Sequence, residues 1–247
     1  MVNTEFNEEQ FRAIYPEGIE AHYWTLARNR ILRKEIEKSG FAHKKLLEIG
    51  CGRGVVVDFL RHTGINCVGV DLAPVEVSAP LNNFVYTGMD FRDLPVDVKN
   101  SIEGILLLDV IEHIEEPQVF LEQVRQSIPN AKICFVTVPA RRELWSNYDS
   151  FNGHYRRYTI PTLKQTLGAL EWRIQKIQYL FHTLYVLARS IVSIAGKRET
   201  TIRAPKGFLT IIHRMLAHFF VFDYLVFPKK VWGTSILCVA MLPQRTQ

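Results

Sequence analysis

Cysteine is scarce and scattered in this sequence of 247 residues, and neither a strong charge of one sign nor a long uncharged apolar run occurs. The cysteines stand too far apart for a disulfide framework or a zinc-ligand spacing, at Cys51, Cys67, Cys134 and Cys238. No uncharged apolar run reaches the roughly 18 residues that cross a bilayer. The first nine residues are polar and acidic, unlike a secretory signal. We therefore expect reduced thiols in a cytoplasmic protein that is soluble or at most peripheral to a membrane.

The excess of basic over acidic residues is small, with 30 Lys and Arg against 25 Asp and Glu. Five charges spread over this length fall short of the footprint of a nucleic-acid-binding protein, so we expect no nucleic-acid partner. Apolar residues make up 47% of the chain, which suits a globular protein with a sizeable core. No internal repeat occurs, and we predict a single domain over residues 1–247.

Strand-like and helical apolar segments alternate from residue 44 onward. This alternation predicts an α/β fold with a doubly wound parallel sheet. We expect its strands near residues 45–49, 66–70, 83–87, 102–108, 131–138, 171–180 and 235–242, and helices near 53–63 and 117–128. A further helix begins at Thr159, which can cap it, has Pro161 in its first turn and ends at Gly168.

Two predicted helical regions lie outside this alternation. Apolar spacing over about residues 17–38 predicts an N-terminal helix within a helical cap, residues 1–40. Residues 181–232 are too many for a plain loop and predict a helical insertion before the last strand. One of its helices carries Leu184, Leu187, Ala188, Ile191 and Ile194, and the other carries Ile211, Ile212, Met215, Leu216, Phe219 and Phe220. A basic linker joins them, with Lys197, Arg198, Arg203 and Lys206.

The insertion is strongly apolar, but charged and histidine side chains interrupt it, so we do not expect it to span a bilayer. The interrupting residues are His213, Arg214, His218 and Asp223. Three roles fit such a segment. We favour a roof over an apolar acceptor pocket, ahead of an interfacial anchor for a lipid-linked substrate and of a homodimer surface.

A glycine-rich loop follows the first predicted strand and precedes a helix, where glycine allows the backbone to approach a ligand closely. Ligands of such sheets bind at the carboxyl ends of the strands. A dinucleotide fingerprint needs glycine at its sixth position, where this sequence has Val55, so the spacing argues against NAD. The predicted cofactor contacts of this segment are Glu48, Gly50, Cys51, Gly52 and Gly54.

Two acids follow the next strands at positions suited to an adenosine. Asp71 ends the second strand and could accept from both ribose hydroxyls. Asp90, after the third strand, could accept from an adenine amino group. Leu72 and Phe91 could sandwich the ring.

Together the glycine loop, the two acids and the segment Leu107-Leu108-Asp109-Val110-Ile111-Glu112-His113 resemble the class I S-adenosylmethionine (SAM) dependent methyltransferases. The segment from Asp109 to Pro117 is similar to that of a small-molecule group that includes ubiquinone-pathway O-methyltransferases. Trp24–Arg28 and Gly153–Thr159 look like segments of glycan and natural-product pathway methyltransferases. This resemblance covers roughly residues 20–180. It implies SAM as cofactor, Asp109 among its contacts, and a Rossmann-like, mostly parallel sheet with an antiparallel last strand.

Methyl transfer from a sulfonium needs an acceptor held in contact range, and no enzyme nucleophile. If the acceptor is a hydroxyl, a histidine is the natural base near neutral pH. The candidate catalytic residues are His113, His154 and Glu112.

A divalent ion is implied by the resemblance to the ubiquinone-pathway enzymes, whose segment would place Asp109, Glu112 and His113 around it. The first of these is Asp here rather than Glu, and its shorter reach argues against the ion. Adjacent residues 112 and 113 could both face one ion only if the backbone is irregular there. We therefore expect no metal.

Aromatic and basic residues gather in the segment 140–158, which could close over the acceptor. The predicted substrate contacts are Trp145, Tyr155, Arg156, Arg157 and Tyr158. The two arginines suggest a carboxylate or phosphate on the acceptor. Alternatively, they tie the loop to the domain through ion pairs with Glu143 or Asp149.

Arg28 could pair with the cofactor's methionine carboxylate, with Trp24 covering it, or could be a solvated helix residue.

The sequence thus predicts a SAM-dependent methyltransferase that acts on a hydroxyl of a small or lipid-linked acceptor. A nucleic-acid methyltransferase is one alternative, but the amino-methylating members carry an Asn/Asp-Pro-Pro-aromatic motif that Asp109-Val110-Ile111-Glu112 does not match. A non-catalytic SAM-binding module that stabilises a partner is another. Every predicted cofactor position holds a suitable residue, which favours the enzyme.

Overall fold

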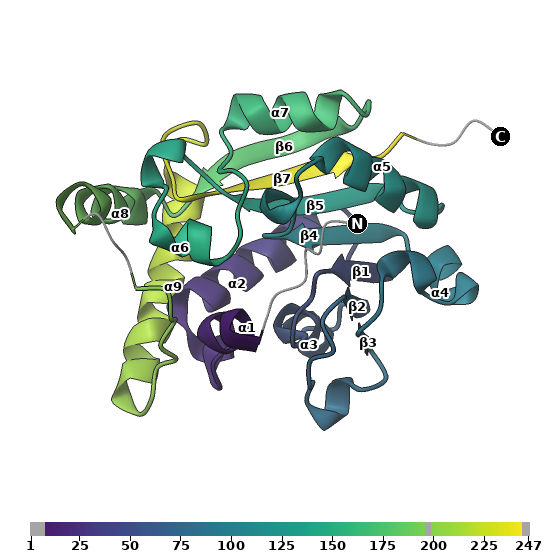
Figure 1. The fold of residues 1–247 in the computed structure, drawn as a ribbon, viewed down its shortest axis with the longest axis horizontal. Coiled ribbons are helices and arrows are strands. Elements are labelled where there is room, and N and C mark those ends of the chain that lie inside the picture. Colours follow the sequence, from purple (N-terminus) through teal and green to yellow (C-terminus); the bar gives the residue numbers. More distant parts are fainter. Residues whose placement is uncertain (1–7, 196–198, 244–247) are drawn as a thin grey trace.

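A seven-stranded sheet forms the centre of the molecule in the computed structural model, which describes residues 8–195 and 199–243 (Figure 1). The strand order is β3-β2-β1-β4-β5-β7-β6, and only β7 runs antiparallel to both of its neighbours. The strands are β1 Leu46–Ile49, β2 Cys67–Asp71, β3 Val85–Thr87, β4 Gly104–Leu108, β5 Ile133–Pro139, β6 Arg173–Leu180 and β7 Ser235–Met241. The predicted Rossmann-like sheet with an antiparallel last strand is confirmed.

Helices cover both faces of this sheet. They are α1 Glu8–Ile14, α2 Tyr23–Lys38, α3 Val55–His62, α4 Val96–Ser101, α5 Pro117–Ser127, α6 Asn147–Phe151, α7 Ile160–Gly168, α8 His182–Ala195 and α9 Phe208–Val226. Buried side chains of α5 and α7, such as Leu121 and Leu163, pack on one face of the sheet. Those of α2 and α3, such as Leu32 and Leu60, pack on the other. Each sheet face is therefore closed by apolar burial, which leaves the carboxyl ends of the parallel strands as the open edge.

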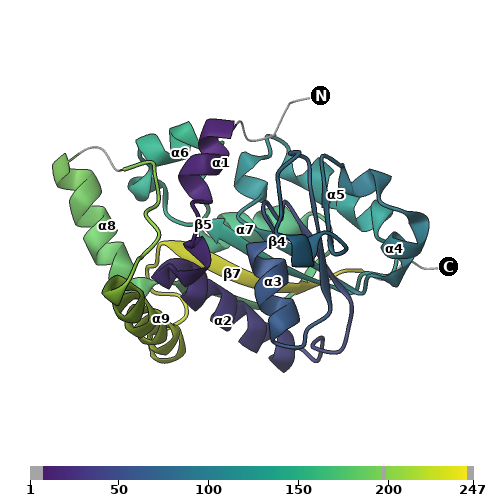
Figure 2. The ribbon, with the colours of Figure 1, turned by 90° about the horizontal axis from the view of Figure 1, so that it is seen from below.

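The two helices between β6 and β7 lie at one end of the molecule (Figure 2). α9 packs Ala217 and Phe220 into a cluster with Ala27 and Ile31 of α2. Its buried Asp223 accepts hydrogen bonds from the backbone N–H groups of His182 and Thr183, at 2.9 and 3.2 Å. Because these N–H groups begin α8, Asp223 acts as its cap and joins the two helices.

Three short helices were not predicted from the sequence: α1, α4 and α6. The expected helix near 17–38 begins only at Tyr23, because the 3₁₀ turn Ile19–Ala21 and the His22 cap precede it. Lys197 and Arg198 of the predicted basic linker lie outside the described residues, as does the acidic start up to residue 7.

Candidate active site

A large cavity opens at the carboxyl ends of β1, β2 and β4, where ligands of such sheets bind. Its volume is about 1260 Å³, above the roughly 300–1000 Å³ of a typical single-ligand pocket. Gly50, Asp71 and Asp90 line one part, and His113 and His154 line another. The cavity therefore has room for a cofactor and an acceptor together.

The glycine loop leads from β1 into α3 with left-handed backbone at Gly50, Gly52 and Gly54. A Cβ at Gly50 would lie 2.9 Å from Val110 Cγ2. A Cβ at Gly52 would lie 2.6 Å from the ring of Tyr15, which reaches the loop from the segment after α1. Both the positive φ angles and these close approaches require glycine.

Asp71 fixes this loop from the end of β2. One of its carboxylate oxygens accepts from Gly52 N–H at 2.7 Å, and the other accepts from Ala73 N–H at 2.9 Å. The carboxylate also lines the cavity. Its position beside the loop suits the ribose contact expected of it.

Two residues of the predicted cofactor segment have side chains outside the cavity lining. Glu48 is buried beneath the loop, and burial raises its pKa to about 8, with Arg28 opposing this shift. Cys51 is also buried, with its thiol against Gly69 and a pKa raised by burial. The side chains of Glu48 and Cys51 are therefore structural, whereas Gly50 between them lines the cavity.

The residues expected around adenine all line the cavity. Phe91 is buried and contacts Phe120 edge-on, whereas Leu72 is exposed. Asp90 caps the 3₁₀ turn Phe91–Asp93 and pairs with Arg92 at 2.6 Å. Burial raises the pKa of Asp90, but hydrogen bonds from Arg92 outweigh it and lower the pKa overall.

Arg28 of α2 pairs with Asp109 just after β4, with 2.7 Å between Nη1 and Oδ2. Its guanidinium stacks 4.6 Å from the centre of the Trp24 ring. The cover by Trp24 was predicted, whereas the pairing with Asp109 was not. Asp109 has a left-handed φ of 58°, a strained conformation that is typical of functional sites.

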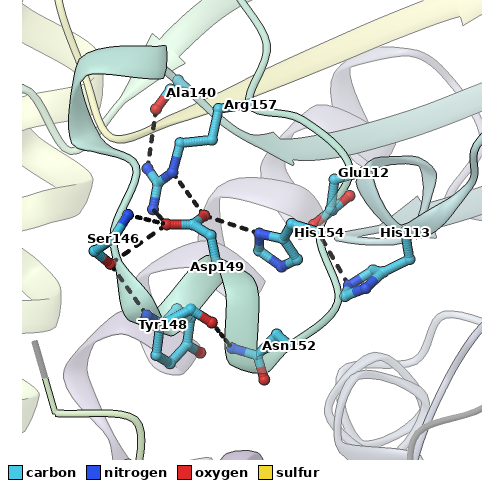
Figure 3. Close-up of polar contacts among 9 residues, drawn as sticks. All are labelled: Glu112, His113, Ala140, Ser146, Tyr148, Asp149, Asn152, His154 and Arg157. Carbon is cyan, nitrogen blue, oxygen red and sulfur yellow. Dashed lines mark hydrogen bonds and ion pairs between the residues drawn. The ribbon is translucent and has the colours of Figure 1, made fainter.

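A buried charged network occupies the acceptor part of the cavity (Figure 3). Asp149 of α6 accepts from Arg157 Nε at 2.7 Å, and the His154 Nδ1 lies 2.9 Å from the same carboxylate oxygen. Asp149 also closes a capping box with Ser146, which fixes its rotamer. Burial raises the pKa of Asp149, but His154 and Arg157 outweigh it and lower the pKa to about 2. Asp149 is thus ionised and holds the ring of His154 in place.

His113 and Glu112 face this network from the 3₁₀ turn Ile111–His113. The rings of His113 and His154 meet edge-on, with their centres 4.6 Å apart. Burial, followed by repulsion from His154, lowers the pKa of His113 to about 3. Burial, followed by repulsion from Asp109, raises the pKa of Glu112 well above its usual range. Near neutral pH, His113 is therefore a neutral imidazole, and burial of Glu112 favours its protonated form.

Asp109, Glu112 and His113, the three residues implied as ligands of a divalent ion, do not come together as a group. Asp109 pairs with Arg28, and the ligand atoms that lie within 4.8 Å of one another belong to Glu112, His113 and His154. The irregular backbone that allows Glu112 and His113 to face one point is the 3₁₀ turn. The third member of the group, His154, is already held by Asp149, which lies 2.9 Å from its Nδ1.

The structure places most of the predicted substrate contacts outside the cavity lining. Tyr158 is a core residue, 2% exposed, whose hydroxyl donates to the carbonyl of Ile111. Arg156 Nη2 donates to the carbonyl of Glu115, and Trp145, Tyr155 and Arg156 are not among the cavity-lining residues. Arg157 lines the cavity but pairs with Asp149, as the alternative interpretation predicted.

Sequence reasoning missed two residues of the site. Asp149 was considered only as an ion-pair partner, although Ser146-x-x-Asp149 has the spacing of a capping box. Tyr15 carries no motif, and only the fold brings it over the glycine loop.

Comparisons with known proteins identify the family of this chain. A family profile described as a methyltransferase domain matches residues 20–177, more than half of the chain. The chain is 24% identical over 115 residues to the mitochondrial ubiquinone biosynthesis O-methyltransferase of Schizosaccharomyces pombe, covering 41% of this chain and 40% of that protein. It is 24% identical over 119 residues to the corresponding enzyme of Idiomarina loihiensis, covering 45% and 49%. The matched part thus spans less than half the length of these relatives.

Two solved structures show the same fold. The magnesium protoporphyrin IX methyltransferase of Synechocystis, with bound S-adenosylhomocysteine, has a TM-score of 0.56 at 12% identity and covers 95% of this chain and 94% of that one. The 1,6-didemethyltoxoflavin-N1-methyltransferase of Burkholderia thailandensis has a TM-score of 0.53 at 14% identity, covering 96% and 84%. On the family match, the sheet order and the glycine loop, the chain belongs to the class I SAM-dependent methyltransferases.

Proposed function

We propose that this enzyme transfers the methyl group of SAM to a hydroxyl oxygen of a small or lipid-linked acceptor, with His154 as the general base. One observation carries the proposal: the ionised Asp149 holds Nδ1 of His154 while His154 lines the cavity. A neutral histidine whose Nδ1–H donates to a carboxylate presents the lone pair of Nε2, which can accept a hydroxyl proton. The resulting imidazolium is then stabilised by Asp149.

Arg157 and Asp149 act as positioning residues for this base. Arg157 contacts both Asp149 oxygens, at 2.7 and 3.1 Å, and also donates to the carbonyl of Ala140 at the end of β5. The histidine is therefore connected to the central sheet through two buried links. Such support holds a catalytic group within the narrow range that proton transfer needs.

His113 has a different role in this proposal. Its low pKa of about 3 makes it a weak proton acceptor. Its ring lies edge-on against His154 and lines the same cavity. We assign it to shaping the wall beside the base.

The cofactor part of the cavity supports the direction of transfer. Asp71 and Asp90 suit the adenosine of SAM, and the histidines lie in the other part of the same cavity. A cofactor bound along the glycine loop would direct its sulfonium methyl toward the acceptor part. Catalysis then rests on holding the hydroxyl in contact range of the methyl group.

The acceptor part is largely apolar, with walls that include Leu144, Leu184, Leu187 and Ile191. Because Arg157 is paired with Asp149, it offers little to an anionic acceptor group. These walls favour a hydrophobic or amphipathic alcohol or phenol. The curated relatives are O-methyltransferases, which supports oxygen as the methylated atom.

The test is transfer of label from methyl-labelled SAM to a host-cell extract divided into aqueous and lipid fractions. We expect label in an organic-soluble product, with mass spectrometry placing the methyl on oxygen. Label on nitrogen or carbon would refute hydroxyl methylation.

A further inference from the structure

Exposed apolar side chains are concentrated at one end of the molecule. Twenty large apolar residues are exposed in the described part of the chain, and sixteen of them lie between residues 186 and 232. We call these sixteen the insertion face. Patches of this kind mark interaction sites on soluble proteins. Figures 1 and 2 both place α8 and α9, which carry most of this face, beside each other at that end.

The insertion face follows one side of α9. Exposed apolar residues recur there at helical spacing, at Phe208, Ile212, Met215, Phe219, Phe222 and Val226. The opposite side packs Ala217, Phe220 and Tyr224 against the domain. By length and composition alone α9 could cross a bilayer. Instead, α9 lies against the domain through its buried side and through Asp223, which caps α8. A helix that is buried on one side and apolar on the other is typical of a helix that lies in the membrane interface.

The positive charge of the protein is concentrated in the same segment. Residues 181–232 contain eight Lys and Arg but two acids, an excess of six, whereas the whole chain has an excess of five. The remainder of the chain is thus slightly negative. Lys229 and Lys230 are exposed and adjoin the exposed Trp232, and a tryptophan beside lysines is typical of a membrane interface.

A second cationic group lies where α9 meets α2. The Nη1 atom of Arg30 is buried without a hydrogen-bond partner in the described part of the chain. Burial, followed by repulsion from the nearby Arg214, lowers the pKa of Arg30. An anionic group from outside the chain would relieve the repulsion between these two guanidinium groups.

We propose that the insertion face docks onto the surface of a bilayer that contains anionic phospholipid. Apolar side chains would enter the interface, and the basic residues around them would bind lipid phosphates. A second copy of the chain is a poorer occupant of this face. Pairing two copies would bring together two segments that each carry an excess of six positive charges, with no exposed acid on α9 to offset them.

The face is continuous with the acceptor part of the cavity. Leu187 and Ile191 of α8 line the cavity, yet they are 62% and 51% exposed. A molecule resident in the membrane could therefore pass along α8 toward His154. This delivery role rests on the proposed function, whereas docking itself does not.

Vesicle flotation of the full chain tests the docking. We expect binding to vesicles of phosphatidylcholine with phosphatidylglycerol, and at least tenfold weaker binding to phosphatidylcholine alone. Phe222→Ser should weaken binding about tenfold. The control is Val96→Ser, which replaces an apolar residue of similar exposure on α4, and it should leave binding unchanged. Lys229→Glu with Lys230→Glu should weaken it at least tenfold, unlike Lys164→Glu with Arg173→Glu. SAM titration verifies that each variant is folded.

Three results would overturn the docking. The wild-type chain could fail to float with either vesicle, or Phe222→Ser could behave like Val96→Ser. Analytical ultracentrifugation could show a dimer that Phe222→Ser dissociates, which would assign the face to a second copy. If the chain floats with the vesicles but transfers no methyl label to a lipid-soluble product, docking stands and only the delivery role is refuted.

Discussion

At the scale of single residues, the chemistry of the acceptor site depends on how His154 is held. The sequence indicated His113 and His154 as candidate bases, and it placed His113 just past the carboxyl end of the fourth predicted strand, where the methyl group should lie. The structure distinguishes them, because His154 contacts an ionised carboxylate, whereas the pKa of His113 is lowered to about 3. Position in the sequence could not reveal this, since the contact of His113 with His154 joins segments that are far apart in the chain.

Replacement of His154 tests its role. His154→Ala should lower kcat about 10²- to 10⁴-fold, the usual contribution of a general base, and leave the Kd for SAM unchanged. His113→Ala should have a smaller effect on kcat. The exposed His62→Ala is the control and should match wild type. Equal kcat for His154→Ala and His62→Ala would remove His154 from the role of base.

Glu48 should make stability depend on pH. Its pKa is about 8 in the folded enzyme and near 4.5 in the unfolded chain, so between these values the folded state binds the extra proton. The free energy of unfolding should therefore fall as pH rises from about 4.5 to 8, by up to about 1.4 kcal/mol per pH unit from this group. Glu48→Gln cannot ionise at this position. In urea denaturation across this pH range, its free energy of unfolding should therefore fall less steeply than that of the wild type. Parallel curves for the two proteins would contradict this account.

At the scale of elements, the glycine loop is held by backbone conformation as much as by contacts. Gly50→Ala introduces a Cβ 2.9 Å from Val110 at a φ of +75°, so it should weaken SAM binding at least tenfold by calorimetry. Gly40→Ala is the matched control, because Gly40 has a φ of +80° but nothing within 4 Å of the new Cβ. It should lose some stability and keep its SAM affinity. Similar affinity losses in both variants would show that strain alone, without the Val110 contact, explains the effect.

The cap of α8 by Asp223 links the two helices between β6 and β7. Asp223→Ala removes acceptors for two backbone N–H groups and for His182 Nδ1, and should lower the free energy of unfolding by about 1–3 kcal/mol. Hydrogen exchange should accelerate in α8 more than in the sheet. Asp97→Ala, at an exposed site on α4, is the control. Unchanged exchange in α8 would show that the cap does not hold the helix.

Sequence patterns predicted every strand of the sheet within a few residues, because buried parallel strands give uninterrupted apolar runs. They missed α1, α4 and α6, which have five to seven residues and too little periodicity to detect. Order along the chain was enough to place Asp71 and Gly50 at the carboxyl ends of their strands, where both line the cavity. The prediction that Tyr158 contacts the substrate was wrong, because its ring is buried in the core by segments distant in the sequence.

At the scale of the whole molecule, the fold places donor and acceptor chemistry in one cavity. The sheet edge supplies the glycine loop, Asp71 and the Glu112–His113 turn, while α6 and α8 supply the other walls. We expected the segment 181–232 to roof the pocket. α8 does line the cavity, but most of the apolar surface of this segment faces outward, which underlies the docking proposal.

A crystal structure with S-adenosylhomocysteine and a hydroxyl-bearing ligand tests this arrangement most directly. We predict the adenosine between Asp71 and Phe91, the sulfur facing the histidines, and the ligand hydroxyl within hydrogen-bond distance of His154 Nε2. A cofactor bound in the reverse direction, or a hydroxyl that contacts His113 while His154 remains apart, would contradict the account.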